Sequence, residues 1–264
     1  MWFIIIMSFM YCIILFMVVL LYYRKPCITF IRPIKTDIVI PRIIYQTYHS
    51  KTKIPNKVFE NLSKFCPNYE LRLYDDTECS MFIKRHFSPD VSYAFDNLKM
   101  GAHRADLFRY CVLYITGGIY IDIKVEPLCE LSKLYRDTSN KAVIYSVIGN
   151  DKQSIFQGII FTPPRQPIFL RLIQNILENI EQASTNYMIF VQFMYKLITD
   201  DVSSCISSGK ILNGRHNDYY LFSERCTQNH YDCYDGLDRY GLCCHVYDGP
   251  VNIFKTRYSD YPWS

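Results

Sequence analysis

The sequence predicts an α/β fold whose sheet is mostly parallel and carries helices on both faces. Short β-branched or aromatic runs alternate with amphipathic helical segments along most of the chain. Clusters of glycine, proline, asparagine and aspartate separate these segments. Half of the 264 residues are hydrophobic and 16% are aromatic, which is ample for a large core. Alternation of this kind is typical of three-layer α/β domains.

The N-terminal segment is predicted to anchor the chain in a membrane. Residues 1–23 carry no charge and are long enough for a span, which needs about 20 helical residues. A basic start and small residues at a cleavage position are both missing, so the segment is expected to remain uncleaved. Residues 24–37, with prolines and interleaved charges, are expected to form a stem. The folded domain is then expected over residues 38–264.

The first half of the domain is predicted to contain two strands and three helices. IVIPRIIYQTY, at residues 38–48, is β-branched, and residues 69–74 alternate between polar and apolar. Residues 56–65 fit a helix between them. Asp75-Asp76-Thr77 is expected to start the next helix as a cap rather than to hold a metal. One long helix is predicted over residues 92–116, ended by two glycines.

The second half continues with an apolar strand, GIYIDIK, and then weakens. The tail after residue 200 has short strands at best and is expected to wrap over the sheet edge. Gly149-Asn150-Asp151 is expected to form a turn. The other expected elements are strands at 142–148 and 154–161, a short helix near 127–135, and helices at 166–181 and 186–199.

Charged residues stand where an α/β sheet binds ligands. Asp106 and Arg109 lie three apart, hence on one helix face; taken alone, they would be an ordinary ion pair worth a few tenths of a kcal/mol. The following strand, however, has isoleucines on one side. Open α/β sheets bind ligands beyond the carboxyl ends of their strands, so a cleft for a charged ligand is favoured over a buried salt bridge. The other side of that strand is expected to carry Tyr120, Asp122, Lys124 and Glu126.

The chain resembles a known family in four segments, which are IPRIIYQTY at 40–48, PNYELRLYDD at 67–76, ADLFRYCVLYITGGIYIDIK at 105–124, and Tyr261-Pro262-Trp263. The family comprises the glycosyltransferases with a DXD sugar-binding region, related to yeast initiating α-1,6-mannosyltransferases and to the sugar-transferring domains of large clostridial toxins. The resemblance implies a GT-A nucleotide-diphospho-sugar transferase fold, a nucleotide-sugar donor, and transfer with retention of configuration.

The resemblance also implies roles for individual residues. Asp106 matches the carboxylate that holds sugar hydroxyls, and Arg109 the guanidinium that meets sugar or phosphate oxygens. Asp122 matches the first acid of Asp-x-Asp, at the ribose and the metal. Lys124 stands in place of the second acid, the usual direct Mn²⁺ ligand, and is the clear departure from the family. Further residues expected around the donor are Tyr120, His245 and Trp263.

Three hypotheses account for Lys124. Its ammonium takes over the role of the ion, which makes the enzyme metal-independent. Alternatively, Glu126, His245 or Asp248 helps Asp122 to recruit Mn²⁺ or Mg²⁺ despite the lysine. In the third hypothesis the site is inactive.

The sequence therefore predicts a single-pass membrane-anchored glycosyltransferase. Its expected partners are a nucleotide sugar, a glycan, protein or lipid acceptor, and the membrane. Nucleic acid is not expected as a partner, because the net charge of +4 is modest and the basic residues are scattered along the chain. A nucleotide-sugar hydrolase and an inactive carbohydrate-binding protein remain alternatives.

The orientation in the membrane is left open by the sequence. Family precedent favours an ER or Golgi lumen, whereas the four basic residues that follow the span favour the cytosol. Cysteines crowd the tail in a density that suits disulfides in an oxidising compartment. They are Cys226, Cys233, Cys243 and Cys244.

Overall fold

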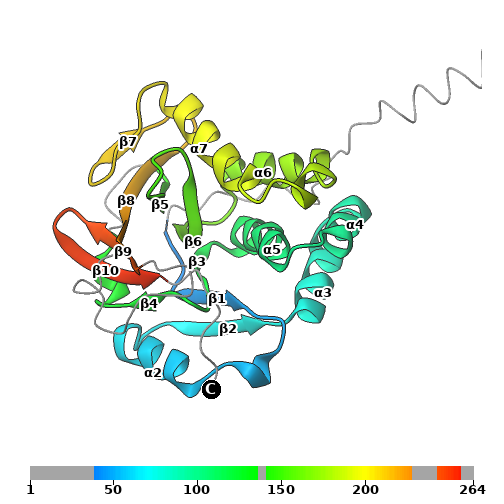
Figure 1. The fold of residues 1–264 in the computed structure, drawn as a ribbon, viewed down its shortest axis with the longest axis horizontal. Coiled ribbons are helices and arrows are strands. Elements are labelled where there is room, and N and C mark those ends of the chain that lie inside the picture. Colours follow the sequence, from blue (N-terminus) through cyan, green and yellow to red (C-terminus); the bar gives the residue numbers. More distant parts are fainter. Residues whose placement is uncertain (1–38, 136–140, 228–242, 257–264) are drawn as a thin grey trace, which may run out of the picture.

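The computed structural model describes residues 39–135, 141–227 and 243–256 (Figure 1). The predicted anchor and stem, at residues 1–37, and Trp263 lie outside the described residues. Within the described ranges, no helix combines the length and the apolar character that crossing a membrane would require.

The described strands form one sheet in which some neighbouring strands are parallel and others antiparallel. Its strands are β1 (Ile43–Thr47), β2 (Glu70–Tyr74), β3 (Gly118–Ile121), β4 (Glu126–Pro127), β5 (Val143–Ile148), β6 (Ile155–Thr162), β7 (Ile211–Asn213), β8 (Asp218–Thr227), β9 (Cys243–Asp248) and β10 (Val251–Thr256). They lie in the order β2-β1-β3-β6-β5-β8-β9-β10-β4, and β7 pairs with β8.

The prediction of a mostly parallel sheet is wrong. Of the described strand pairs, only β1–β2, β1–β3 and β5–β8 are parallel, and the rest are antiparallel. The links at residues 149–154 and 249–250 are too short for a parallel crossover, which needs a dozen residues or more. The tail also does not simply wrap over an edge, because β8, β9 and β10 extend the sheet itself.

Helices cover the two faces unequally (Figure 1). One core lies between the sheet and the helices from α3 to α7, and a second lies between the sheet and α2. Strand β3 divides between them as its alternation predicts, with Tyr120 in the first core and Ile119 and Ile121 in the second. The helices are α2 (Asn56–Phe65), α3 (Asp76–His86), α4 (Pro89–Asn97), α5 (Gly101–Thr116), α6 (Pro167–Glu178) and α7 (Ile189–Val202), with short 3-10 turns η1 (Lys51–Lys53), η2 (Leu131–Lys133) and η3 (Gln182–Ser184).

The single long helix predicted over residues 92–116 is divided into α4 and α5. Leu98 and Met100 have extended backbones, with ψ of 118° and 129°. Asn97 and Gly101 flank the break and are weak helix formers, while the buried Leu98 fixes the link against the core. The cap predicted at Asp75 is confirmed, because its side chain accepts a hydrogen bond from the Glu78 backbone in a capping box.

A glycine sets the angle between α5 and β3. Gly117 ends α5 with φ of 63°, a conformation that strains other residues, and β3 begins at the next residue. A Cβ atom at Gly117 would lie 2.5 Å from the backbone nitrogen of Pro164. The turn therefore brings the two charged segments of the sequence together, one on the helix and one after the strand.

Substituting Gly117 is expected to destabilise the fold. Gly117→Ala combines backbone strain with a backbone clash and should cost at least about 2 kcal/mol, or roughly 4–8 °C in Tm. Gly101→Ala, on the same helix, is the matched control, because its Cβ would meet nothing within 4 Å. Thermal unfolding of the two variants measures the difference, and equal Tm values would contradict the role given to Gly117.

Candidate active site

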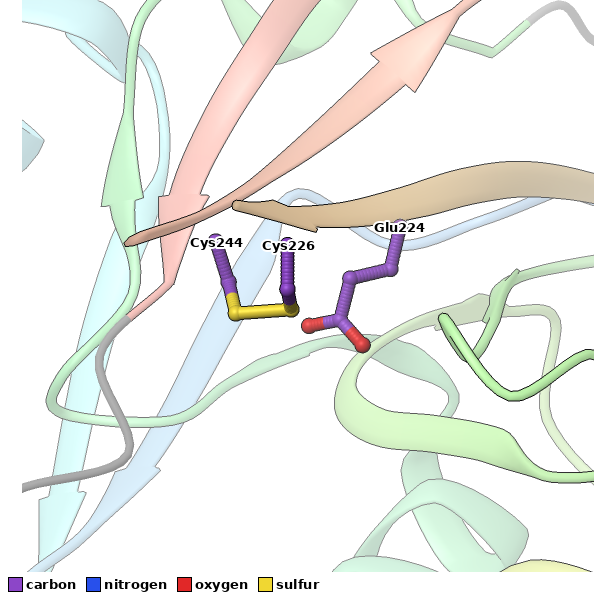
Figure 2. Close-up of side chains that lie close together, drawn as sticks. All are labelled: Glu224, Cys226 and Cys244. Atoms are coloured by element: carbon purple, nitrogen blue, oxygen red, sulfur yellow. A yellow bond between two sulfur atoms is a disulfide. The ribbon is translucent and has the colours of Figure 1, made fainter. Parts of the chain in front are cut away.

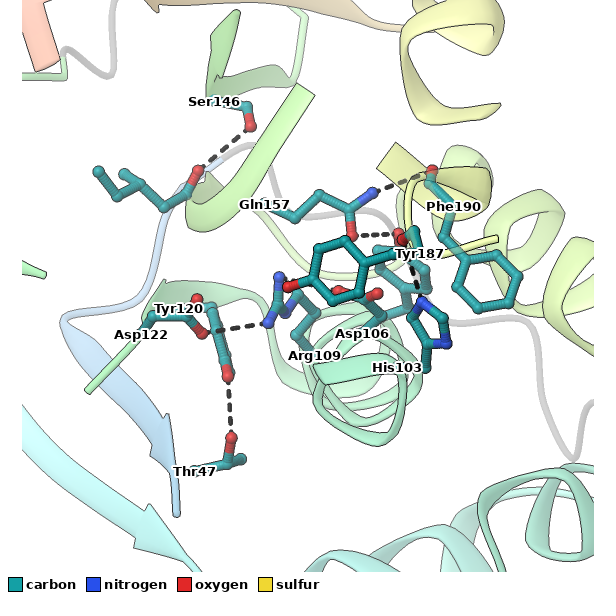
Figure 3. A network of polar contacts seen from close by, with 12 residues as sticks. Thr47, His103, Asp106, Arg109, Tyr120, Asp122, Ser146, Gln157, Tyr187 and Phe190 are labelled. Carbon is teal, nitrogen blue, oxygen red and sulfur yellow. Dashed lines mark hydrogen bonds and ion pairs between the residues drawn. The ribbon is translucent and has the colours of Figure 1, made fainter. Parts of the chain in front are cut away.

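A buried arginine joins α5 to the end of β3. Arg109 Nη1 lies 3.0 Å from Asp106 Oδ1, and its Nη2 lies 3.1 Å from Asp122 Oδ1. The Arg109 side chain is only 5% exposed, and its guanidinium sits over the ring of Tyr120, 4.5 Å from the centroid. Figure 3 shows these side chains converging from the helix and the strand. Asp106 and Arg109 thus belong to a buried network and are not an exposed helical pair.

Burial and charge together set the ionisation of this network. Burial alone would lower the pKa of Arg109, but the carboxylate of Asp122, with smaller contributions from Tyr120 and Asp106, raises it above its usual value. Burial raises the pKa of Asp106, and the charge on Arg109 offsets part of that rise. The guanidinium therefore stays charged and fixes the carboxylate oxygen of each aspartate that it contacts.

Tyr120 stabilises this arrangement by packing its ring against the Arg109 guanidinium. It is fully buried, and its hydroxyl lies 2.9 Å from Thr47 Oγ1 at the end of β1. Burial raises the pKa of the Tyr120 phenol, so the hydroxyl remains a neutral hydrogen-bonding group. Tyr120, predicted near the donor, is absent from the cavity wall and holds Arg109 and Thr47 in place.

The chain turns at the acidic residue that follows β3. Asp122 N donates to Gly158 O at 2.8 Å, and Val125 N donates to Asp122 O at 2.9 Å, which closes a turn. The predicted extension of this strand through Lys124 is therefore wrong, because the chain leaves its pairing with β6 there. A Cβ at Gly158 would lie 2.8 Å from Asp122 Oδ2, so glycine makes room for the carboxylate.

The network opens into a cavity of about 420 Å³. The cavity wall includes all four charged residues that were predicted to surround one ligand, namely Asp106, Arg109, Asp122 and Lys124. The Asp122 side chain is 34% exposed, so its carboxylate is accessible from the cavity. The wall also includes residues 47–49 at the end of β1, 101–105 of α5, 154–158 around β6, Tyr187, Met188 and Val191 near the start of α7, and Glu224.

Three other predicted residues lie elsewhere. Glu126 pairs with Lys255 between β4 and β10, and His245 lies in β9; neither is part of the cavity wall. Asp248 accepts a hydrogen bond from the Tyr220 hydroxyl, a structural contact. The roles predicted for Glu126 and His245 at the donor, like that for Trp263 outside the described residues, stay predictions.

Several residues of the cavity wall were not found from the sequence. His103 lies one turn before Asp106 and is buried on the same helix face, so the spacing 103, 106, 109 was a usable clue. Gly158, inside an apolar run, indicated close approach of another group. Gln157 and Glu224 had no local clue, because only the fold brings their strands to the cavity.

Glu224 of the cavity wall lies beside a disulfide-linked strand pair (Figure 2). Cys226 and Cys244 occupy paired positions on β8 and β9 and are joined by a disulfide, which confirms a bridge in the tail. The buried carboxylate of Glu224 beside them accepts hydrogen bonds from Asn150 N at 3.3 Å and Thr256 Oγ1 at 3.2 Å. Since both sulfurs are in a disulfide, this cluster offers no thiolate ligands to a metal.

Asp122 does not belong to a three-ligand metal cluster. Among the described residues, the one grouping of three potential protein ligands is the cluster at Glu224, and it does not include Asp122. The wall beside Asp122 also carries the cations Arg109 and Lys124, and Asp106 and Asp122 are both paired with Arg109. The donor set is therefore suited to an anionic ligand that is held by side-chain charge.

Comparisons with known proteins agree with the resemblance predicted from the sequence. Residues 53–141 match the family described as "Glycosyltransferase sugar-binding region containing DXD motif", and Asp122 and Lys124 lie in this segment. A mannosyl phosphorylinositol ceramide synthase of Saccharomyces cerevisiae is 32% identical over 147 residues, which are 52% of this chain and 35% of the relative. An initiation-specific α-1,6-mannosyltransferase of Schizosaccharomyces pombe is 27% identical over 161 residues, covering 53% and 40%.

The chain thus spans less than half the length of either relative. Among solved structures, the PaToxG glycosyltransferase is 17% identical, with a TM-score of 0.46 over 62% of this chain and 72% of that chain.

Removing the central guanidinium is expected to destabilise the protein. Arg109→Met leaves two carboxylates without their shared partner and should cost about 3–5 kcal/mol. Adding Asp106→Asn should recover part of that loss, because it removes the more deeply buried unpaired charge. Urea unfolding of the single and double variants measures the coupling, and strictly additive losses would contradict the network.

Proposed function

We propose that this chain is a membrane-anchored glycosyltransferase that moves a sugar from a nucleotide-sugar donor to an acceptor with retention of configuration. The observation that carries the proposal is the network of Asp106, Arg109 and Asp122 in the cavity wall. Asp106, Arg109 and Asp122 also fall within the matched sugar-binding region. The proposed organisation is an anchor at 1–23, a stem at 24–37 and a GT-A transferase domain at 38–264.

The wall is suited to the parts of such a donor. Carboxylates accept hydrogen bonds from hydroxyl groups, so Asp106 and Asp122 are placed to hold the sugar and the ribose. Residues 47–49, at the carboxyl end of β1, then flank the nucleotide base. The diphosphate carries the negative charge and belongs beside Lys124, whose ammonium suits phosphate oxygens.

The reaction follows from this placement. The bond from the anomeric carbon to the diphosphate oxygen breaks, and a bond forms from that carbon to the acceptor oxygen. The acceptor hydroxyl gives its proton to the departing diphosphate on the same face of the sugar, which preserves configuration. Lys124 stabilises the charge that develops on the diphosphate, while Asp106 and Asp122 hold the sugar for attack. Because Asp122 is paired with Arg109 and Lys124 stands in place of the second acid, we propose that transfer is metal-independent.

Turnover of nucleotide sugars tests this function. The full-length chain in detergent is assayed with UDP- and GDP-sugars, GDP-mannose among them because the relatives are mannosyl-transferring by name. We expect nucleotide release with one donor, at a rate unaffected by EDTA or Mn²⁺, and a loss of at least about 100-fold in Asp122→Ala. Equal turnover by Asp122→Ala would overturn the site assignment.

The same assay separates the alternatives. Sugar that appears only free in solution would identify a hydrolase, and donor binding without turnover would identify a carbohydrate-binding protein. Lys124→Met is expected to lose activity in EDTA, and Lys124→Asp should regain part of it only with Mn²⁺, because it restores Asp-x-Asp. If EDTA abolishes the activity of the unmodified chain, the proposal of metal independence is wrong.

We further propose that the domain lies in an oxidising lumen. The Cys226–Cys244 disulfide supports this placement, since disulfides persist in such compartments and are rare in the cytosol. The four basic residues after the predicted span favour the opposite orientation, so a direct measurement is needed.

Thiol labelling of intact microsomes decides between the two orientations. Without reduction, Cys226 and Cys244 should resist alkylation and appear as a linked peptide pair, whereas the exposed free Cys205 should be labelled once detergent is added. External protease should leave the domain intact until detergent is added. Alkylation of both Cys226 and Cys244, with digestion in intact vesicles, would place the domain in the cytosol.

A further inference from the structure

The first turn of α7 and the residues before it form a wall of the cavity that the donor assignments leave unused. Tyr187, Met188 and Val191 contribute to this wall. Tyr187 is 57% exposed, which is high for a large aromatic side chain bordering a cavity. We call Tyr187, Met188 and Val191 the aromatic wall.

Buried polar side chains hold the aromatic wall in place. His103 is 1% exposed, and its Nε2 lies 3.1 Å from the main-chain oxygen of Tyr187. Gln157, also 1% exposed, donates from Nε2 to the main-chain oxygen of Phe190 at 3.1 Å and accepts from the Tyr110 hydroxyl. Because α5 and β6 each fix one carbonyl, the aromatic wall is positioned before any ligand arrives.

The aromatic wall adjoins the sugar-holding residues along α5, where His103 contacts the Tyr187 backbone and Arg109, farther along the helix, contacts Asp122. In Figure 3, the backbone of Tyr187 lies beside His103, and the Tyr187 ring extends across Asp106 and Arg109. His103, Asp106 and Arg109 follow one face of α5, so the cavity continues along this helix from the donor to the aromatic wall. A group seated there would be adjacent to the donor sugar and away from the diphosphate.

We propose that the aromatic wall is the acceptor subsite and that its occupant is an uncharged sugar ring, stacked on Tyr187. This inference rests on the proposed transferase function. The three side chains of the wall carry no formal charge, so they do not select a carboxylate or phosphate. An exposed tyrosine beside two aliphatic side chains instead suits the apolar face of a pyranose, with its hydroxyls directed to the cavity.

Steady-state kinetics test the acceptor subsite. With methyl α-D-mannopyranoside and methyl α-D-glucopyranoside as acceptor probes, Tyr187→Ala should raise the acceptor KM about tenfold and change the donor KM far less. Tyr187→Phe should restore the acceptor KM, because the ring is kept. Tyr93→Ala is the matched control, since Tyr93 is 65% exposed on α4 and outside the cavity wall.

Binding measured without turnover keeps this test separate from the test of the proposed function. Saturation-transfer NMR of the same two glycosides should show contact with the full-length chain that Tyr187→Ala loses and Asp122→Ala retains. That result would support the subsite even if no nucleotide sugar were turned over. An unchanged acceptor KM, or unchanged glycoside contact, in a folded Tyr187→Ala would overturn the proposal.

Discussion

The ion pairs of Arg109 with Asp106 and Asp122 are the interaction on which the site depends. They connect a helix to the turn after a strand, at only 5% exposure of the arginine. Burying a charged side chain this deeply costs free energy, and the ion pairs with the oppositely charged partners offset that cost. The aspartates are therefore held with one oxygen committed to the guanidinium, an arrangement that fixes their orientation toward the cavity before a ligand binds.

The rest of the fold can be understood as support for that geometry. Gly117 lets β3 follow α5 directly, and Gly158 leaves room for the Asp122 carboxylate. Tyr120 lies under the guanidinium and reaches Thr47, so the end of β1 is tied to the same centre. The neighbouring order β1-β3-β6 brings these residues together, because each supporting group comes from the next strand in the sheet.

The parts of this site that were predicted from the sequence are those encoded locally. Asp106, Arg109 and Asp122 lie within seventeen consecutive residues, and helix periodicity, a glycine stop and an apolar strand were enough to bring them together. Gln157 and Tyr187 escaped prediction, since their contacts with Tyr110 and His103 span long stretches of chain. The direction of the strands in the second half was predicted wrongly for a related reason. The residue pattern of an apolar strand does not show which strand it pairs with.

The turn that follows β3 changes the surroundings expected for Lys124. In a continuing strand Lys124 would point to the same side as Asp122, and the two charges would pair as neighbours across one pleat. In the observed turn, which closes when Val125 N donates to Asp122 O, Lys124 contributes to the cavity wall and Asp122 is paired with Arg109. The turn thus places Asp122 and Lys124 differently from two alternate residues of one strand. In the proposed reaction, Asp122 holds hydroxyl groups and Lys124 directs its positive charge toward the diphosphate.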